Sequence, residues 1–398
     1  MKKFTFLLLQ FLFIQFTAKA QDTIPVIFHI VHSGQSVGTG SNLAQARLVS
    51  QLQILNADYA GTGYGSVNAP SVWHPANTQI VFMPALYDPQ GNLLVEPGID
   101  RINYVSKGWQ NPGSFSNTSM FMNYIDNTLK HQGNWPPSLY CNIWVTDAGS
   151  SVNLMGWGSL PSNSGLPWAT PAWNNADTLS SGIWIWNNVV GNTGSTSNPY
   201  NLGRTATHET GHWLGLMHPV IGCPTDSSYC ADLPHIRSGT TSSYMACNST
   251  FPDTAHSCPL DTNGTMFMNF MNTYICSDTD IYMFTTCQGN AMRQALHTSP
   301  QRSPLLSSNV YRLHTNSVQQ LSEIKFEIYP NPATDKLIIN AATTAYSLRI
   351  TDVLGKLVYA EKNLSGKKEI ATSGWMPGVY MVYIQAGEKT HTAKVLKQ

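Results

Sequence analysis

Charged side chains are scarce in this sequence. Asp, Glu, Lys and Arg make up 11% of its 398 residues, against about a quarter in an average soluble domain. The formal net charge is zero, so the basic surface that nucleic-acid binding requires is not indicated. Ser, Thr, Asn and Gly take the place of the charges, which is typical of the weakly charged surfaces of many exported proteins.

Long hydrophobic runs are missing beyond Ala20. At the start, Lys2 and Lys3 precede an apolar run from Phe4 to Phe16, and small residues follow at Ala18-Lys19-Ala20. This is the pattern of a cleavable signal peptide, and the run is too short to cross a bilayer. No cysteine lies near the cleavage point, which disfavours a lipoprotein. We expect a signal peptide at residues 1–20, a mature chain from about Gln21, no long prosegment and no transmembrane segment.

Cysteine is absent before Cys141, and no C-x-x-C pair occurs anywhere. Without such a pair, a Cys-ligated zinc site is disfavoured. The other six cysteines cluster between positions 223 and 287, and in an exported protein such a cluster indicates disulfides. Cys141 itself lies in the apolar run 139–145, so we expect it to be a buried free thiol. The clustered cysteines are Cys223, Cys230, Cys247, Cys258, Cys276 and Cys287.

Strand and helix patterns alternate up to about residue 200, which predicts an α/β layer arrangement. The expected strands are 24–31, 80–83, 102–105, 139–146, 154–160 and 183–190. The expected helices are 44–59, 119–131 and 204–216. Residues 219–290 lack long periodic segments and predict an irregular lobe held by disulfides, and the pattern at 294–318 is typical of a polar connector.

The tail of the chain, from position 321 to the end, has a different character. It carries 17 of the 44 charged side chains, a shift that indicates a domain boundary near residue 320. Short alternating runs at 324–328, 336–339, 347–351, 379–385 and 392–396 are separated by turn signals such as Pro330-Asn331-Pro332. This pattern predicts a small all-β sandwich. We therefore expect a main domain at 21–300, a linker at 301–323 and a second domain at 324–398.

Residues 208–219 read His-Glu-Thr-Gly-His-Trp-Leu-Gly-Leu-Met-His-Pro. On a helix, His208 and His212 lie one turn apart on the same face and can bind one metal ion. Gly215 can adopt the left-handed conformation that ends a helix, so that the chain turns back and delivers His218 as a third ligand. Three neutral imidazoles leave a fourth position open, as a catalytic zinc requires, and Glu209 reaches beside the metal as a general base. The alternative is a helix with three surface histidines.

This pattern matches the metzincin signature of zinc peptidases. The resemblance to the pappalysin family of metzincins goes further. It implies a zinc cleft between an upper lobe, with a twisted mixed sheet and helices, and an irregular disulfide-bonded lower lobe that often holds calcium. The matching stretches are IPVIFHIVH at 24–32, LNADY at 55–59, NIWVTDAG at 142–149, NLGRTATHETGHWLGLMHP at 201–219, NFM at 269–271 and MFTTCQ at 283–288.

The family resemblance also implies roles for residues of the lower lobe. Met271 would form the apolar Met turn beneath the zinc. The family places a Tyr two residues after this Met, where this chain has Thr273, and Tyr274 would then be the residue that steadies the oxyanion. The implied disulfides are Cys223–Cys247 and Cys258–Cys276. The segment before Phe284-Thr285 is longer by about two residues than in the family, so a cleavage preference does not transfer.

The tail resembles the C-terminal sorting domain of the type IX secretion system in residues 328–333, 353–356, 378–380 and 394–397. That resemblance implies export through the periplasm to the cell surface or the medium, with the outer-membrane secretion machinery as a partner. The sequence thus predicts a secreted zinc endopeptidase that acts on proteins or peptides, which would add a strand to the cleft edge at 154–160. The alternatives are a non-catalytic surface binding protein that retains a zinc site, and a zinc amidase acting on non-protein amides.

Overall fold

The computed structural model describes residues 21–168, 179–194, 196–223, 230–240, 244–313, 326–341, 345–353, 355–386 and 389–398. Contacts divide the chain into two compact units, Met1–Leu313 and His314–Gln398, each with its own buried core. The expected signal peptide lies outside the described residues. None of the described helices is long and apolar enough to cross a membrane.

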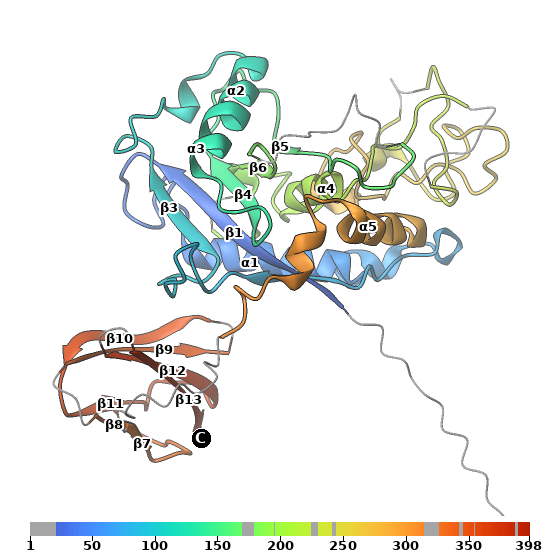
Figure 1. The fold of residues 1–398 in the computed structure, drawn as a ribbon. Helices are drawn as coiled ribbons and strands as arrows, with labels where there is room; N and C mark the ends of the chain where they lie inside the picture. The colour runs from blue at the N-terminus through green and yellow to red at the C-terminus, as the bar shows by residue number, and fades with distance from the viewer. Residues whose placement is uncertain are drawn as a thin grey trace, which may run out of the picture. The chain divides into compact units, whose positions relative to one another are not determined.

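The first unit is built on a mixed sheet around β1 (Asp22–His32), as Figure 1 shows. Strands β2 (Ile80–Pro84), β3 (Ile99–Asn103) and β4 (Cys141–Thr146) all pair with β1 in parallel. Most of β1 is buried, as expected for a parallel strand covered on both faces. The expected strand at 24–31 and the mixed sheet are confirmed.

The far edge of this sheet turns antiparallel. Strand β6 (Ile183–Trp186) pairs in parallel with β4, and β5 (Gly156–Gly158) pairs antiparallel with β6. Both strands are shorter than expected, since 183–190 ends as a strand at Trp186 and 154–160 narrows to three residues. The shortened β5 is an edge strand, with β6 as its one partner among the described strands.

Helices cover both faces of the sheet because successive side chains on a strand point to opposite faces. Ile24, Val26 and Phe28 pack into a core with α1 (Gln45–Tyr59), α4 (Arg204–Trp213) and α5 (Thr286–Thr298). Trp144 and Trp184 point the other way, toward α2 (Thr118–Tyr124). That helix continues through a π-helical stretch, Ile125–Lys130, into α3 (His131–Gly133). The expected helices at 44–59 and 119–131 are confirmed.

The connector expected at 294–318 is wrong as far as residue 313, and the rest of it lies outside the described residues. Helix α5 runs to Thr298, a 3-10 helix follows at Ser303–Ser307, and Arg302 and Leu305 are fully buried. Residues 301–313 therefore belong to the first unit rather than to a linker. The buried face of α5 contains Ala291, Met292, Ala295 and Leu296 at helical spacing, a pattern that the expectation of a connector overlooked.

The lower lobe is held by three disulfides, Cys223–Cys258, Cys230–Cys287 and Cys247–Cys276. The expected pairs Cys223–Cys247 and Cys258–Cys276 are therefore wrong. Six cysteines allow 15 pairings, and sequence separation alone does not choose among them. Cys141 is a buried free thiol, which confirms that part of the interpretation.

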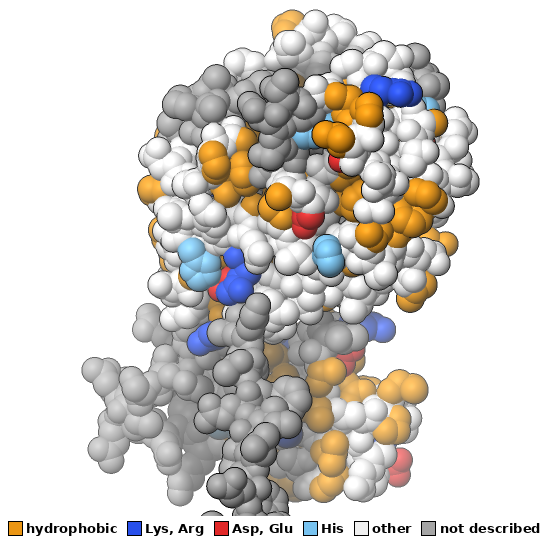
Figure 2. Space-filling view, turned by 90° about the vertical axis from the view of Figure 1, so that its right-hand side faces the viewer, with side chains coloured by type: hydrophobic (Ala, Val, Ile, Leu, Met, Phe, Trp, Pro, Cys, Tyr) orange, Lys and Arg blue, Asp and Glu red, His pale blue; other side chains and the backbone are white. Residues whose placement is uncertain are grey.

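The second unit consists of two antiparallel sheets around one apolar core, which confirms the expected small β-sandwich. Leu337, Ile339, Ile350, Val382 and Ile384 are among its buried residues. One sheet contains β7 (Phe326–Tyr329), β8 (Lys336–Ala341) and β11 (Lys367–Ala371). The other contains β9 (Tyr346–Asp352), β10 (Leu357–Leu364), β12 (Gly378–Ala386) and β13 (Lys389–Lys397). The face drawn in Figure 2 shows few charged side chains, in keeping with the composition.

Candidate metal centre

The turn at the C-terminal end of α4 determines the geometry of the candidate centre. Gly215 has a φ of +94°, its N–H donates to the carbonyl of His212 at 2.8 Å, and the N–H of Leu216 donates to the carbonyl of Gly211 at 2.9 Å. These two bonds form a Schellman motif, which requires a left-handed residue and reverses the chain direction. The reversal brings His218 back toward the helix, as the sequence predicted.

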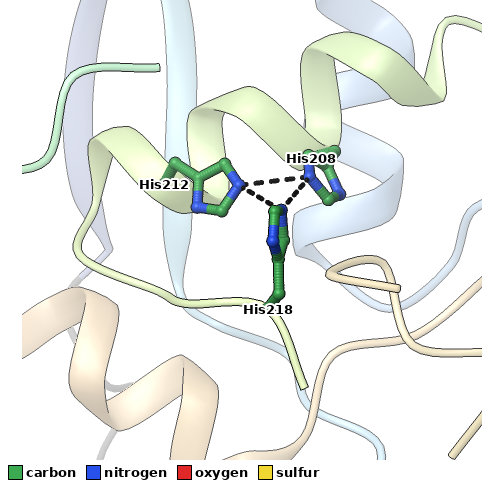
Figure 3. Close-up of side chains that lie close together, drawn as sticks. All are labelled: His208, His212 and His218. Carbon is green, nitrogen blue, oxygen red and sulfur yellow. Dashed lines mark hydrogen bonds between the residues drawn. The ribbon is translucent and has the colours of Figure 1, made fainter. Parts of the chain in front are cut away.

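The three histidines meet at their Nε2 atoms (Figure 3). The Nε2 atom of His208 lies 3.1 Å from that of His212 and 3.2 Å from that of His218, and the distance from His212 to His218 is 2.9 Å. A tetrahedral zinc with Zn–N bonds of 2.0–2.1 Å sets its ligand nitrogens about 3.3 Å apart. The observed triangle is close to that size.

The hydrogen bonds of the other ring nitrogens decide which tautomer is present. Nδ1 of His208 donates to the carbonyl of Phe270 at 2.7 Å, and Nδ1 of His212 donates to the carbonyl of Leu216 at 2.8 Å. A neutral imidazole that donates through Nδ1 has an unprotonated Nε2. Burial, assisted by the neighbouring imidazoles, lowers the pKa of His208 to about 4 and that of His212 well below its ordinary value.

At least two nitrogen lone pairs therefore converge at this point without a proton between them. The pKa of His218 is also lowered by burial, so the third imidazole is neutral as well near pH 7. Such an arrangement is repulsive unless a cation occupies its centre. The residues present therefore fit a nitrogen-preferring divalent ion, of which zinc is the usual one.

Glu209 borders the same cavity and is only 8% exposed. Burial raises its pKa to about 8, opposed by a hydrogen bond from the backbone N–H of Gly158 and by the charge of Lys130. A bound divalent cation would favour the carboxylate form. The structure thus brings together His208, Glu209, His212 and His218, the four residues that the motif predicted.

Two glycines let the edge strand β5 lie directly on α4. A Cβ atom at Gly156 would lie 2.5 Å from Cγ of Glu209, and one at Gly158 would lie 2.2 Å from the backbone oxygen of Glu209. Side chains at either position would push the strand away from the helix. Trp157, between them, is 40% exposed, so β5 places backbone, rather than side chains, beside Glu209.

Met271 lies beneath the helix in the position expected for the Met turn. It is fully buried, and its sulfur is 2.5 Å from where a Cβ of Gly211 would be. The turn is held by Asn269, whose Oδ1 accepts hydrogen bonds from the N–H of Met271 at 2.9 Å and from Nε2 of Gln288 at 3.0 Å. Phe270, which lies between Asn269 and Met271, supplies the carbonyl that orients His208.

Tyr274 does not lie where the resemblance implied. Its ring packs 5.6 Å from that of Tyr244, in the core of the lower lobe, and Thr273 borders the cavity instead. The geometry therefore lends no support to an oxyanion role for Tyr274. The residues that sequence reasoning missed act through the backbone: the carbonyls of Phe270 and Leu216 and the N–H of Gly158.

The cavity has a volume of about 900 Å³ and extends to both sides of the histidines. Beyond the first turn of α4 it is bordered by Met155, Trp186, Tyr200 and Ile281. Beyond the last turn it is bordered by Leu160, Trp168, Met217 and Val220. Because it continues in both directions, an extended chain can lie across the centre rather than end at it.

The chain is similar to several known proteins. Residues 327–398 match the family described as the secretion system C-terminal sorting domain. The chain is 29% identical to mature mirolysin of Tannerella forsythia, solved in complex with a cleaved peptide, with a TM-score of 0.54 over 72% of this chain and 96% of mirolysin. For a promirolysin mutant of the same organism the identity is 28% and the TM-score 0.55, over 74% and 87% of the two chains.

An extracellular metalloprotease of Verticillium alfalfae is 26% identical over 219 residues, which cover 55% of this chain and 59% of the relative. The chain thus spans about three fifths of the length of this curated relative. Together the matches describe a metallopeptidase homologue with a type IX secretion tail. The sorting domain and the extracellular relatives indicate a secreted or cell-surface protein.

Proposed function

We propose that this metallopeptidase homologue is a secreted, zinc-dependent endopeptidase of the pappalysin type. The observation that carries the proposal is the convergence of the Nε2 atoms of His208, His212 and His218, with Glu209 beside them. Zinc bound there would supply Lewis-acid polarisation of a peptide carbonyl and would activate water.

Glu209 is the general base in this proposal. Its carboxylate takes the proton of the attacking water and passes it to the nitrogen of the leaving amine. Gly158 donates its backbone N–H to that carboxylate and holds it in one orientation. Met271 and the carbonyls of Phe270 and Leu216 keep the imidazole rings in place, because ligands fixed by outer partners need not reorganise during reaction.

The substrate would bind in extended form along β5. This strand pairs with β6 on one side and has no other partner among the strands that the structure describes, so its other edge can accept a further strand through main-chain hydrogen bonds. The cavity continues beyond both ends of the histidine cluster. A peptide bond within a chain, rather than at its end, therefore suits the site, which is the reason for proposing an endopeptidase.

The test is digestion of a mixed peptide library by the zinc-loaded protein, with Glu209→Gln as the matched control. Internal cleavage by the parent and none by the control would support the proposal. Binding of peptides without cleavage would instead indicate a surface binding protein. Cleavage of simple amides but not of peptides would indicate a zinc amidase.

The sorting domain would connect this enzyme to the outer-membrane secretion machinery. Deletion of residues 327–398 should leave the protein inside the cell envelope, whereas the intact chain is exported. Structural calcium is not part of the proposal. The two other clusters of metal-ligand type among the described residues, Cys230–Asp232–Cys287 and Cys247–Cys276–Asp280, each contain a disulfide.

A further inference from the structure

Arg302 is fully buried and has no carboxylate within ion-pair distance among the described residues. Its guanidinium donates instead to three groups from separate segments. Nε donates to the carbonyl of Trp213 at 2.9 Å, Nη1 to Oγ of Ser181 at 2.9 Å, and Nη2 to the carbonyl of Ser159 at 3.1 Å. The guanidinium also lies over the indole ring of Trp213, 4.1 Å from its centroid.

These partners belong to the two elements that form the proposed peptidase site. Trp213 is the last residue of α4 and follows the metal-binding residue His212, and Ser159 follows Gly158, the last residue of β5. One side chain therefore joins the end of the metal-binding helix to the end of the substrate-binding strand.

The bond to Trp213 also completes the end of α4. The Schellman motif satisfies the carbonyls of Gly211 and His212, and the N–H of Leu214 donates to Thr210. The carbonyl of Trp213 is the next along the helix, and Arg302 is its donor. A cation at this end of a helix is favourable, because the carbonyl ends of the peptide dipoles point there.

The neighbours of Arg302 hold the same segment of chain. Oε1 of Gln301 accepts from the N–H of Ser162 at 3.1 Å, and Oγ of Ser299 donates to the carbonyl of Ser162 at 2.8 Å. The turn after α5 therefore contacts residues 159 and 162, the continuation of β5. Packing alone would favour an apolar residue at position 302, since a buried charge without a counterion is costly.

We propose that Arg302 is a positioning residue of the peptidase site, which holds β5 at a fixed distance from the metal-binding turn of α4. The inference rests on the proposed function. Arg302 does not border the cavity. It acts through Ser159 on Gly158, whose N–H contacts Glu209, and through Trp213 on the adjacent His212.

The test compares Arg302→Met and Arg302→Lys with Leu305→Ala in the full chain. Leu305 is fully buried three residues further on, so its truncation weakens the same segment while leaving the hydrogen bonds of Arg302 to Trp213, Ser181 and Ser159 in place. Each variant is loaded with zinc, its metal content and thermal unfolding are measured, and kcat and KM are determined for a peptide that spans both sides of the cavity. Amide hydrogen exchange of residues 156–159 is followed as a readout independent of activity.

We expect Arg302→Met to retain stoichiometric zinc, to exchange the β5 amides at least about tenfold faster, and to lose about tenfold to 100-fold in kcat/KM, as for loss of a charged donor. Arg302→Lys should fall between it and the parent, and it carries the test if Arg302→Met does not fold. Leu305→Ala should lower the unfolding temperature without faster β5 exchange.

Unchanged β5 exchange in Arg302→Met and Arg302→Lys would overturn the proposal. So would equal losses of kcat/KM in Arg302→Met and Leu305→Ala once the folded fraction is corrected for. If the zinc-loaded parent cleaved no peptide, the proposed function would fail, while the exchange rates would still report whether Arg302 holds β5.

Discussion

The backbone carbonyl of Phe270 lies 2.7 Å from Nδ1 of His208 and accepts a hydrogen bond from it. The two residues are 62 positions apart in the chain, so this bond joins the lower lobe to the metal-binding helix. One residue later, Met271 packs its sulfur against the helix at Gly211. The same turn thus fixes the tautomer of His208 and packs against the helix beside it, which would stiffen the proposed metal centre.

Removal of the metal should abolish hydrolysis and destabilise the first unit, because the histidine lone pairs would then face one another. An ion present at about 1,000 times its Kd would stabilise the folded chain by about 4 kcal/mol. Thermal unfolding with a chelator, and after zinc is restored, measures this difference. His218→Ala, which removes one ligand, should show a much smaller response to zinc. An equal response in both proteins would place the metal elsewhere.

Glu209→Gln should keep the metal and lose hydrolysis. The amide has almost the same shape as the carboxylate but cannot accept a proton, and loss of a general base costs on the order of 10²- to 10⁴-fold in kcat. Zinc content by mass spectrometry and kcat on a peptide substrate check the two halves of this prediction. Near-parental kcat with full zinc occupancy would exclude the general-base role.

Gly158→Ala should inactivate the enzyme by displacing β5. Its Cβ would lie 2.2 Å from the backbone oxygen of Glu209, and no side-chain rotation can move either of these two atoms. Overpacking of this kind costs about 1–3 kcal/mol in stability, and the N–H of residue 158 would lose its alignment with Glu209. Gly374→Ala is a suitable control, because nothing lies within 4 Å of a Cβ there. Circular dichroism and kcat/KM measure the two effects.

The sequence predicted the part of the site whose residues lie close together along the chain. His208, Glu209 and His212 share one helix, and Gly215 allows the reversal that delivers His218, so one short motif contains the proposed ligands and the proposed base. The partners that orient these residues are backbone groups. Every residue has a backbone carbonyl, so no sequence pattern could single out the carbonyl of Phe270.

Other parts of the fold could not be predicted from the sequence for a different physical reason. Helix α5 exposes a polar face, and Arg302 lies in a polar stretch where an arginine is typical of a surface. Strands β10 and β11 were missed because lysine and glutamate interrupt their alternating pattern. Only the folded chain shows that Arg302 is buried against carbonyls from elsewhere in the chain.

The disulfide pattern can be tested without reduction of the protein. Burial raises the pKa of the Cys141 thiol to about 12, so at pH 8 it should resist alkylation in the folded chain and react only after unfolding. Peptide mapping should then show Cys141 as the single labelled cysteine, with Cys230 joined to Cys287. In the chain-entropy model, a bridge between residues 57 apart stabilises by about 4 kcal/mol. A Cys223–Cys247 peptide would contradict the structure.

The boundary of the catalytic unit can be tested with two truncated chains. The chain ending at residue 313 retains Arg302, Leu305 and Val310, all of which are buried in the first unit. The chain ending at residue 300 loses these side chains and leaves the carbonyls of Ser159 and Trp213 without their donor.

Each buried acceptor that loses its partner costs about 1–3 kcal/mol, and burial of each lost aliphatic side chain contributes about 1.5–3 kcal/mol. The sum is comparable to the total stability of many domains. We therefore expect the chain of residues 21–313 to unfold cooperatively and to hydrolyse peptides at the rate of residues 21–398, and the chain of residues 21–300 to be unfolded or to bind zinc without hydrolysis. Thermal unfolding and kcat/KM of the three proteins decide this, and full activity of the shortest one would show that the turn after α5 is dispensable.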